Sequence, residues 1–258
     1  MLTKKINIKN KKGLKLATII DRPKDNNHCS AVIILHGFMD CKDEEHLKYL
    51  AQELVKAGYV AVRFDCSGFS DSEGTIEKDF RFSNYQTDLE RVYDHVRKLK
   101  YVRKESIGVC GHSMGAMQSI IFAANHPEIK AACHISPSDS VDVPSIDFSK
   151  WKKAGYLEFT GSKVGAIRIP YAFFTDAKDL DILKYVRKTN TANTSVLVVL
   201  GNKDEVVLPE QTRAVAKAFS GEFPLLEIEN MHHMYKNSRK ETIGVTRKIV
   251  DFFKMHLI

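Results

Sequence analysis

Short apolar runs alternate with helix-length amphipathic segments along most of this chain. The runs have the length and residue types of buried strands and cover residues 31–35, 59–64, 106–110, 131–135, 196–200 and 225–228. Segments with helical periodicity lie between or after them, over residues 44–57, 84–99, 113–125, 209–219 and 239–255. Strands that are apolar on both faces form parallel sheets covered by helices on both sides. The pattern therefore predicts a doubly wound α/β fold with a mostly parallel sheet, preceded by a β-hairpin over residues 4–21.

One interval between predicted strands is too long for a single crossover. About 60 residues separate the strand that ends near Ile135 from the one that begins near Ser195, whereas a crossover needs about a dozen. The interval carries many apolar and aromatic side chains, so we expect it to fold over the main domain as a lid. The predicted division is an α/β core of residues 1–136 and 195–258 and a lid of residues 137–194, inserted after the sixth strand.

The sharpest motif is Gly111-His112-Ser113-Met114-Gly115, which fits G-x-S-x-G. A buried strand is predicted directly before it and a helix directly after it. A serine in such a tight turn presents its hydroxyl at the carboxyl edge of the sheet, and the helix N-terminus supplies N–H groups that favour negative charge. Ser113 is therefore the predicted nucleophile.

A serine hydroxyl needs a general base and a group that orients the base. Asp204 follows the predicted strand 196–200, and His233 follows the predicted strand 225–228, so both lie at the same sheet edge as Ser113. The order serine, acid, histidine along the chain is that of one fold class and differs from the orders in chymotrypsin and subtilisin.

Two of these assignments have competitors in the sequence. His232 is adjacent to His233 and could be the base, and Asp139 or Asp142 could be the acid. The spacing from Asn230 to Tyr235 favours His233, and the Gly-x-x-Asp context favours Asp204. His36 and His112 are interpreted as structural residues, because the sequence has no H-E-x-x-H motif and no set of cysteines and histidines at metal-ligand spacing. We therefore predict no metal site.

Together these residues resemble the α/β-hydrolase superfamily across essentially the whole chain. In that superfamily the loop after the third strand carries His-Gly-x, and here His36-Gly37-Phe38 follows the strand 31–35. The resemblance implies that the backbone N–H groups of Phe38 and Met114 form an oxyanion hole. It also implies a covalent acyl-enzyme mechanism without a cofactor.

Within the superfamily, the chain is most similar to lidded feruloyl or cinnamoyl esterases and related short-chain carboxylesterases. The similarity is carried by His36-Gly37-Phe38 followed by Asp43-Glu44-Glu45-His46, by the inserted lid, and by Asp204-Glu205-Val206-Val207 with His233. It implies a small-molecule ester substrate and a substrate contact from Tyr156 or Tyr171. A monoacylglycerol lipase, a thioesterase or an acylaminoacyl-type peptidase would use the same triad, and a non-catalytic ligand-binding protein is the alternative from another class.

Composition limits the remaining function classes. The net charge is +7, but no basic cluster accompanies a nucleic-acid-binding motif, so we expect solvated faces and no nucleic-acid partner. The five cysteines form no C-x-x-C pair, which predicts reduced thiols. No apolar run has the roughly 18 residues of a membrane span, and no secretory signal is seen, so we expect a cytoplasmic protein. The sequence does not determine the oligomeric state, and a homodimer is one candidate.

Overall fold

A computed structural model describes residues 1–24, 28–142, 144, 146–161, 165–189, 193–219, 225–235 and 238–257. Within them, eight strands form one sheet in the order β1-β2-β4-β3-β5-β6-β9-β10. Their bounds are β1 Leu2–Lys9, β2 Lys15–Arg22, β3 Cys29–Leu35, β4 Val60–Phe64, β5 Val102–His112, β6 Ala131–Ile135, β9 Ser195–Gly201 and β10 Leu225–Ile228. The β1–β2 and β2–β4 pairs are antiparallel, and all other pairs in this sheet are parallel. The predicted fold class is thus confirmed.

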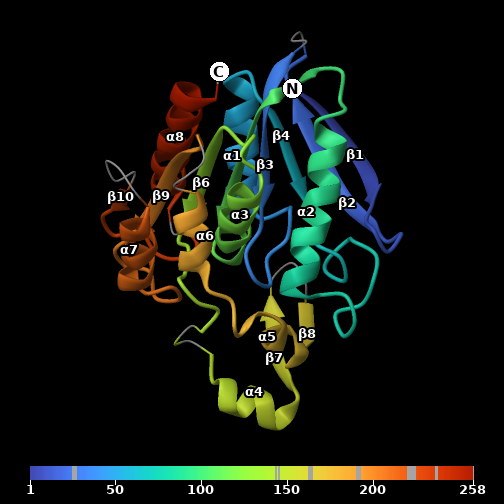
Figure 1. Ribbon diagram of the computed structural model, residues 1–258, viewed down its shortest axis with the longest axis vertical. Helices are drawn as coiled ribbons and strands as arrows, with labels where there is room; N and C mark the ends of the chain where they lie inside the picture. Colours follow the sequence, from blue (N-terminus) through green and yellow to red (C-terminus); the bar gives the residue numbers. More distant parts are fainter. Residues whose placement is uncertain are drawn as a thin grey trace.

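Helices cover both faces of the sheet (Figure 1). One face carries α1 (Glu45–Lys56) and α8 (Arg239–His256), and the other carries α2 (Phe82–Val96), α3 (Met114–Asn125), α6 (Ile182–Thr189) and α7 (Pro209–Ala218). Strand alternation divides the core in two: Val32 and Ile34 pack with α1 and α8, whereas Ile33 and Leu35 pack with α2 and α3. Burial on both faces explains why β3 is apolar without alternation.

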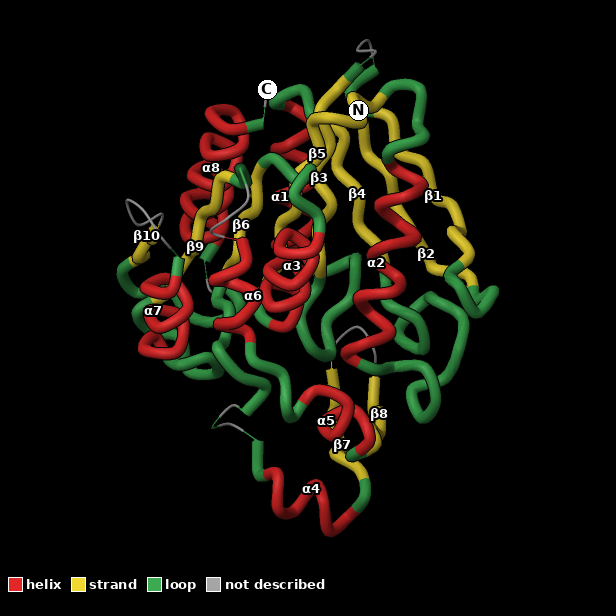
Figure 2. Tube along the Cα trace, in the orientation of Figure 1, coloured by secondary structure: helices red, strands yellow, loops and turns green. Residues whose placement is uncertain are grey.

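The long connection between β6 and β9 contains more secondary structure than the sequence pattern indicated. It holds α4 (Phe148–Ala154), β7 (Tyr156–Gly161), β8 (Gly165–Pro170) and α5 (Ala172–Ala177), followed by α6. The strands β7 and β8 pair with each other in an antiparallel two-stranded sheet. Figure 2 shows that α4, β7, β8 and α5 lie beyond one end of the main sheet, whereas α6 lies beside α3.

Polar contacts attach this inserted segment to the main body. The backbone N–H and the hydroxyl of Ser83, in α2, each lie 2.8 Å from the carboxylate of Asp176, in α5. Inside the segment, the indole N–H of Trp151 donates to the carbonyl oxygen of Ile169 at 3.0 Å. The segment is therefore folded and anchored on α2.

Two further expectations from the sequence concern the cysteines and membrane-spanning helices. All five cysteines are buried and none forms a disulfide. In the described ranges, no helix combines the length and the apolar character needed to cross a membrane.

Candidate active site

Four loops meet at the carboxyl edge of the parallel strands. They follow β3, β5, β9 and β10 and carry Gly37, Ser113, Asp204 and His233 respectively. Because neighbouring parallel strands end at the same edge of a sheet, residues far apart in the sequence come together here. The strand order determines which side chains can touch.

Ser113 occupies a strained turn between β5 and α3. Its φ of 56° and ψ of −120° lie where a residue with a side chain is rarely found. A Cβ atom on Gly111 would lie 2.0 Å from the carbonyl oxygen of Gly115, and a Cβ on Gly115 would lie 2.4 Å from that of Leu35. Both glycines of the motif are therefore required by the packing of backbone against backbone.

Ser113, His233 and Asp204 form a continuous hydrogen-bonded chain. His233 Nε2 lies 3.1 Å from Ser113 Oγ, and His233 Nδ1 lies 2.9 Å from both carboxylate oxygens of Asp204. Asp204 Oδ1 also accepts the backbone N–H groups of Val206 and Val207. Burial alone would raise the pKa of Asp204, but the hydrogen bond and charge of His233 outweigh burial and lower it. The carboxylate therefore stays ionised beside the imidazole.

The loops of Asp204 and His233 support each other. A Cβ on Gly201 would lie 2.4 Å from the carbonyl oxygen of Met231, so the two loops approach each other at a glycine. The N–H of Lys203 donates to that same carbonyl at 3.0 Å. The Gly-x-x-Asp context found in the sequence thus has a steric cause.

The side chains that the sequence offered as alternatives to His233 and Asp204 lie away from Ser113. His232 has a side chain that is 45% exposed and pairs with Glu205 at 3.1 Å, on the surface. Asp142 is exposed, and His233 Nδ1 contacts Asp204 instead of Asp139 or Asp142. The structure therefore brings together the three residues that the sequence favoured.

The loop after β3 is fixed by the imidazole of His36. His36 Nδ1 donates to the carbonyl oxygen of Gly37 at 2.8 Å, and His36 Nε2 accepts the N–H of Cys66 at 3.3 Å. The ring also stacks on Tyr85. Phe38 and Met114 both border the cavity into which Ser113 opens. Neither of their amide N–H groups donates to another residue of the described chain.

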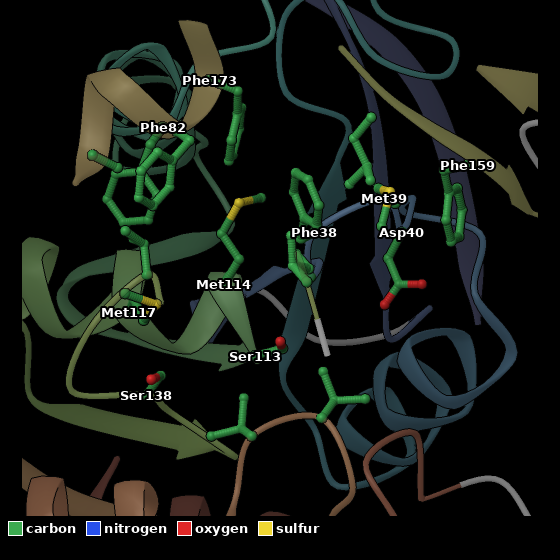
Figure 3. Close-up of a pocket in the computed structure, with 18 of the residues that line it drawn as sticks. Phe38, Met39, Asp40, Phe82, Ser113, Met114, Met117, Ser138, Phe159 and Phe173 are labelled. Carbon is green, nitrogen blue, oxygen red and sulfur yellow. The ribbon is translucent and has the colours of Figure 1, made fainter. Parts of the chain in front are cut away.

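The cavity above Ser113 has a volume of about 580 Å³. Figure 3 shows Phe82, Met117 and Phe173 on one side of Ser113, and Met39, Asp40 and Phe159 on the other. The inserted segment contributes much of the apolar wall, through Phe148, Trp151, Leu157, Phe159, Phe173 and Phe174. The cavity is thus lined by the main body and the insertion together.

Tyr156 and Tyr171, which the resemblance suggested as substrate contacts, do not belong to this wall. Tyr156 is 37% exposed, and the guanidinium of Arg168 lies 4.5 Å from its ring centre. Tyr171 packs its ring against Trp151 and Phe174. Alternation along β7 turns Tyr156 away from the face that carries Leu157 and Phe159. A strand assignment for residues 156–161 would have identified this.

One group among the described residues combines side chains that can ligate a metal. Asp40, His46 and His112 place one candidate ligand atom each within 4.8 Å of one another. His112 already uses Nε2 in a 2.8 Å contact with the carbonyl oxygen of His233. The group therefore adjoins the loop that carries His233.

A strained serine between a strand and a helix, with an acid and a histidine on later strands in that order, defines a serine hydrolase of the α/β-hydrolase superfamily. The sequence model of the family described as serine aminopeptidase, S33, matches residues 26–183, and the chain belongs to this family.

Individual relatives span nearly the whole chain. A thermostable monoacylglycerol lipase from Bacillus sp. (strain H-257) is 23% identical over 240 residues, which cover 87% of this chain and 90% of the lipase. The solved structure of Est1E from Butyrivibrio proteoclasticus with ferulic acid bound has a TM-score of 0.77 at 24% identity, covering 96% of this chain and 99% of that one. The α/β hydrolase GrgF from Penicillium sp. sh18 has a TM-score of 0.83 at 17% identity, covering 100% and 99%. Because both solved structures are less than 25% identical to this chain, their similarity establishes a shared fold and nothing more.

Proposed function

We propose that this protein hydrolyses carboxylic esters through a covalent acyl-enzyme on Ser113. The observation that carries the proposal is the hydrogen-bonded chain Ser113–His233–Asp204 at the floor of an apolar cavity. Ser113 Oγ attacks the ester carbonyl carbon while His233 Nε2 takes its proton. His233 then protonates the leaving alcohol, and water repeats the sequence to release the acid. Asp204 holds the imidazole with its proton on Nδ1.

The negative charge that develops on the carbonyl oxygen needs donors beside Ser113. The amide N–H groups of Phe38 and Met114 are unused among the described residues and border the same cavity. Met114 is the first residue of α3, where helical N–H groups have no partner within the helix. We assign the oxyanion hole to these two amides, and each such donor contributes roughly 3 kcal/mol to transition-state stabilisation.

The cavity wall supports substrates with an apolar or aromatic portion. Its volume of about 580 Å³ and its seven aromatic rings accommodate a short acyl chain or a hydroxycinnamoyl group. Two relatives agree with this range, since one is a monoacylglycerol lipase and another was solved with ferulic acid bound. We further propose that the inserted segment acts as a lid, because its side chains line the cavity and its attachment to α2 runs through Asp176 and Ser83.

A panel of substrates tests the proposal. Hydrolysis of p-nitrophenyl acetate, butyrate and octanoate and of methyl ferulate is measured for the wild type and for Ser113→Ala. We expect turnover of the short esters or of methyl ferulate, and loss of at least about a thousandfold in the variant. Turnover of octanoate alone would indicate a lipase. Aminoacyl amides form the comparison set, since the family description names an aminopeptidase, and faster turnover of these amides would replace the ester proposal.

A further inference from the structure

Asp40 places a carboxylate on the wall of a cavity that is otherwise largely apolar. Its side chain is 14% exposed, and it lies in the loop that follows β3, two residues after Phe38. A Cβ on Gly37 would lie 3.1 Å from Asp40 Oδ2 and 3.4 Å from the Cβ of Ser113. The carboxylate and the nucleophile therefore flank the same glycine, and Figure 3 shows Asp40 and Ser113 bordering the same cavity.

Histidine side chains, and not a lysine or an arginine, keep the carboxylate of Asp40 ionised. Burial alone would raise the pKa of Asp40, but the hydrogen bond and charge of His112, with the charges of His46 and His36, lower it. No lysine or arginine occurs among the described residues that line the cavity. Glu44, also buried, adds a second carboxylate to the same wall.

The other two carboxylates of the wall differ from Asp40. Asp147 and Glu158 are exposed and form ion pairs with Lys150 and Arg168 at 3.2 and 3.0 Å. Their charges are therefore compensated at the outer rim of the cavity. Asp40 faces the inside, so its charge acts on whatever occupies the space beside Ser113.

Asp40 lies on the side of the cavity where the leaving alcohol must be. His233 Nε2 protonates the leaving oxygen, so the alcohol portion of an ester lies near His233. His112 connects the two residues, because its Nε2 is 2.8 Å from the carbonyl oxygen of His233 and its Nδ1 is 3.8 Å from Asp40 Oδ2. The apolar side chains of Phe82, Met117 and Phe173 lie across Ser113 and suit the acyl portion (Figure 3).

We propose that Asp40 forms a leaving-group subsite, which selects esters whose alcohol portion carries a hydroxyl donor or a positive charge close to the ester oxygen. This inference rests on the proposed ester hydrolysis. A carboxylate in a site of low polarity favours such groups, because charge-assisted hydrogen bonds and ion pairs are stronger there than in water. A plain alkyl alcohol offers no donor or positive charge to the carboxylate and gains none of this stabilisation.

Matched butyrate esters test the subsite. Glycerol 1-monobutyrate is compared with propyl butyrate, which lacks its hydroxyls, and butyrylcholine is compared with 3,3-dimethylbutyl butyrate, its uncharged isostere. For each pair the ratio of kcat/KM values is measured in the wild type, in Asp40→Asn and in Glu158→Gln. We expect the wild type to prefer the polar member of at least one pair, and Asp40→Asn to reduce that ratio about tenfold. The pair that responds shows whether hydroxyl donors or charge are recognised.

Glu158→Gln is the matched control, because it removes one carboxylate from the cavity rim and is expected to leave the ratio unchanged. Equal kcat/KM values within both pairs in the wild type would overturn the subsite without any variant. The subsite would also be overturned if Asp40→Asn, shown by thermal unfolding to be folded, gave the same ratios as the wild type. Absence of turnover for all four esters would overturn the subsite, and absence of turnover for the p-nitrophenyl esters and methyl ferulate as well would overturn the proposed function.

Discussion

His112 Nε2 lies 2.8 Å from the main-chain carbonyl oxygen of His233, so the residue before the nucleophile holds the loop of the proposed base. The two imidazole rings are 4.9 Å apart, and the ring of Tyr235 packs against His112 from the same loop. His112 is fully buried. The motif therefore positions two members of the triad, since Ser113 follows His112 directly.

Replacement of His112 by phenylalanine is expected to lower kcat about three- to tenfold with little change in KM. The variant keeps a ring of similar size but removes the N–H that holds the carbonyl of His233, and a neutral hydrogen bond contributes roughly 1 kcal/mol. Steady-state kinetics on p-nitrophenyl butyrate measure the effect. An unchanged kcat in a protein of unchanged thermal stability would show that the loop of His233 is held by its other contacts.

Gly111→Ala is expected to abolish activity and to reduce stability. The new Cβ would stand 2.0 Å from the carbonyl oxygen of Gly115, so the turn that carries Ser113 would have to shift. Gly244→Ala is the matched control, because a Cβ there meets nothing within 4 Å and the residue lies inside α8. Alanine in a helix interior is expected to stabilise by about 0.5–1 kcal/mol. Activity and urea unfolding are compared, and a fully active Gly111→Ala would refute the steric argument.

Lys42→Met is expected to reduce the free energy of unfolding by about 3–5 kcal/mol. Lys42 Nζ lies 2.9 Å from Oδ2 of Asp65, whose side chain is fully buried, and it also contacts Asp71. Burial alone would lower the pKa of Lys42, but these carboxylates raise it. The variant leaves Asp65 buried without its cation. Lys254→Met, which breaks an exposed pair with Asp251, is the control and should unfold like the wild type in urea. Equal stability of both variants would contradict the argument.

Asp204→Asn is expected to lower kcat by roughly four orders of magnitude, because an amide does not hold the imidazole in the required tautomer. The substitution also changes how the free energy of unfolding depends on pH. The pKa of Asp204 is below its ordinary value of 3.8, so its ionised form contributes stability above about pH 4, and this contribution is lost as the pH falls through the lower value. Urea unfolding of wild type and variant should therefore differ by a constant amount from pH 7 to about 5, and the difference should begin to shrink below about pH 4 and vanish only below the lowered pKa. If the wild type gained stability relative to the variant as the pH fell from about 5 to 3, the pKa direction would be contradicted.

The main fold was predictable because each local signal agreed with the global architecture. The apolar runs became β3, β4, β5, β6, β9 and β10, and the segment 4–21 became the hairpin of β1 and β2. Boundaries moved by a few residues: α2 begins at Phe82 and ends at Val96, where the periodicity indicated 84–99. Packing on the sheet, and not the hydrophobic period alone, sets these ends.

The inserted segment was the least predictable part of the site. Its apolar residues showed that it is folded, but not that Tyr156–Gly161 is a strand, and the face of each side chain depends on that assignment. Asp40 was missed for another reason. Nothing in its neighbours along the sequence marks it, and its position beside Ser113 follows only from the meeting of the β3 and β5 loops at Gly37.

The most direct test of the central claim is covalent labelling with a serine-directed fluorophosphonate, followed by mass spectrometry of proteolytic peptides. We expect one adduct on Ser113 in the native wild type, with strongly slowed labelling in His233→Ala and in Asp204→Asn, because His233 takes the proton of Ser113 Oγ. Heat-unfolded protein should remain unlabelled. An unlabelled native protein, or an adduct on another residue with Ser113 unmodified, would contradict the assignment of Ser113 as the nucleophile.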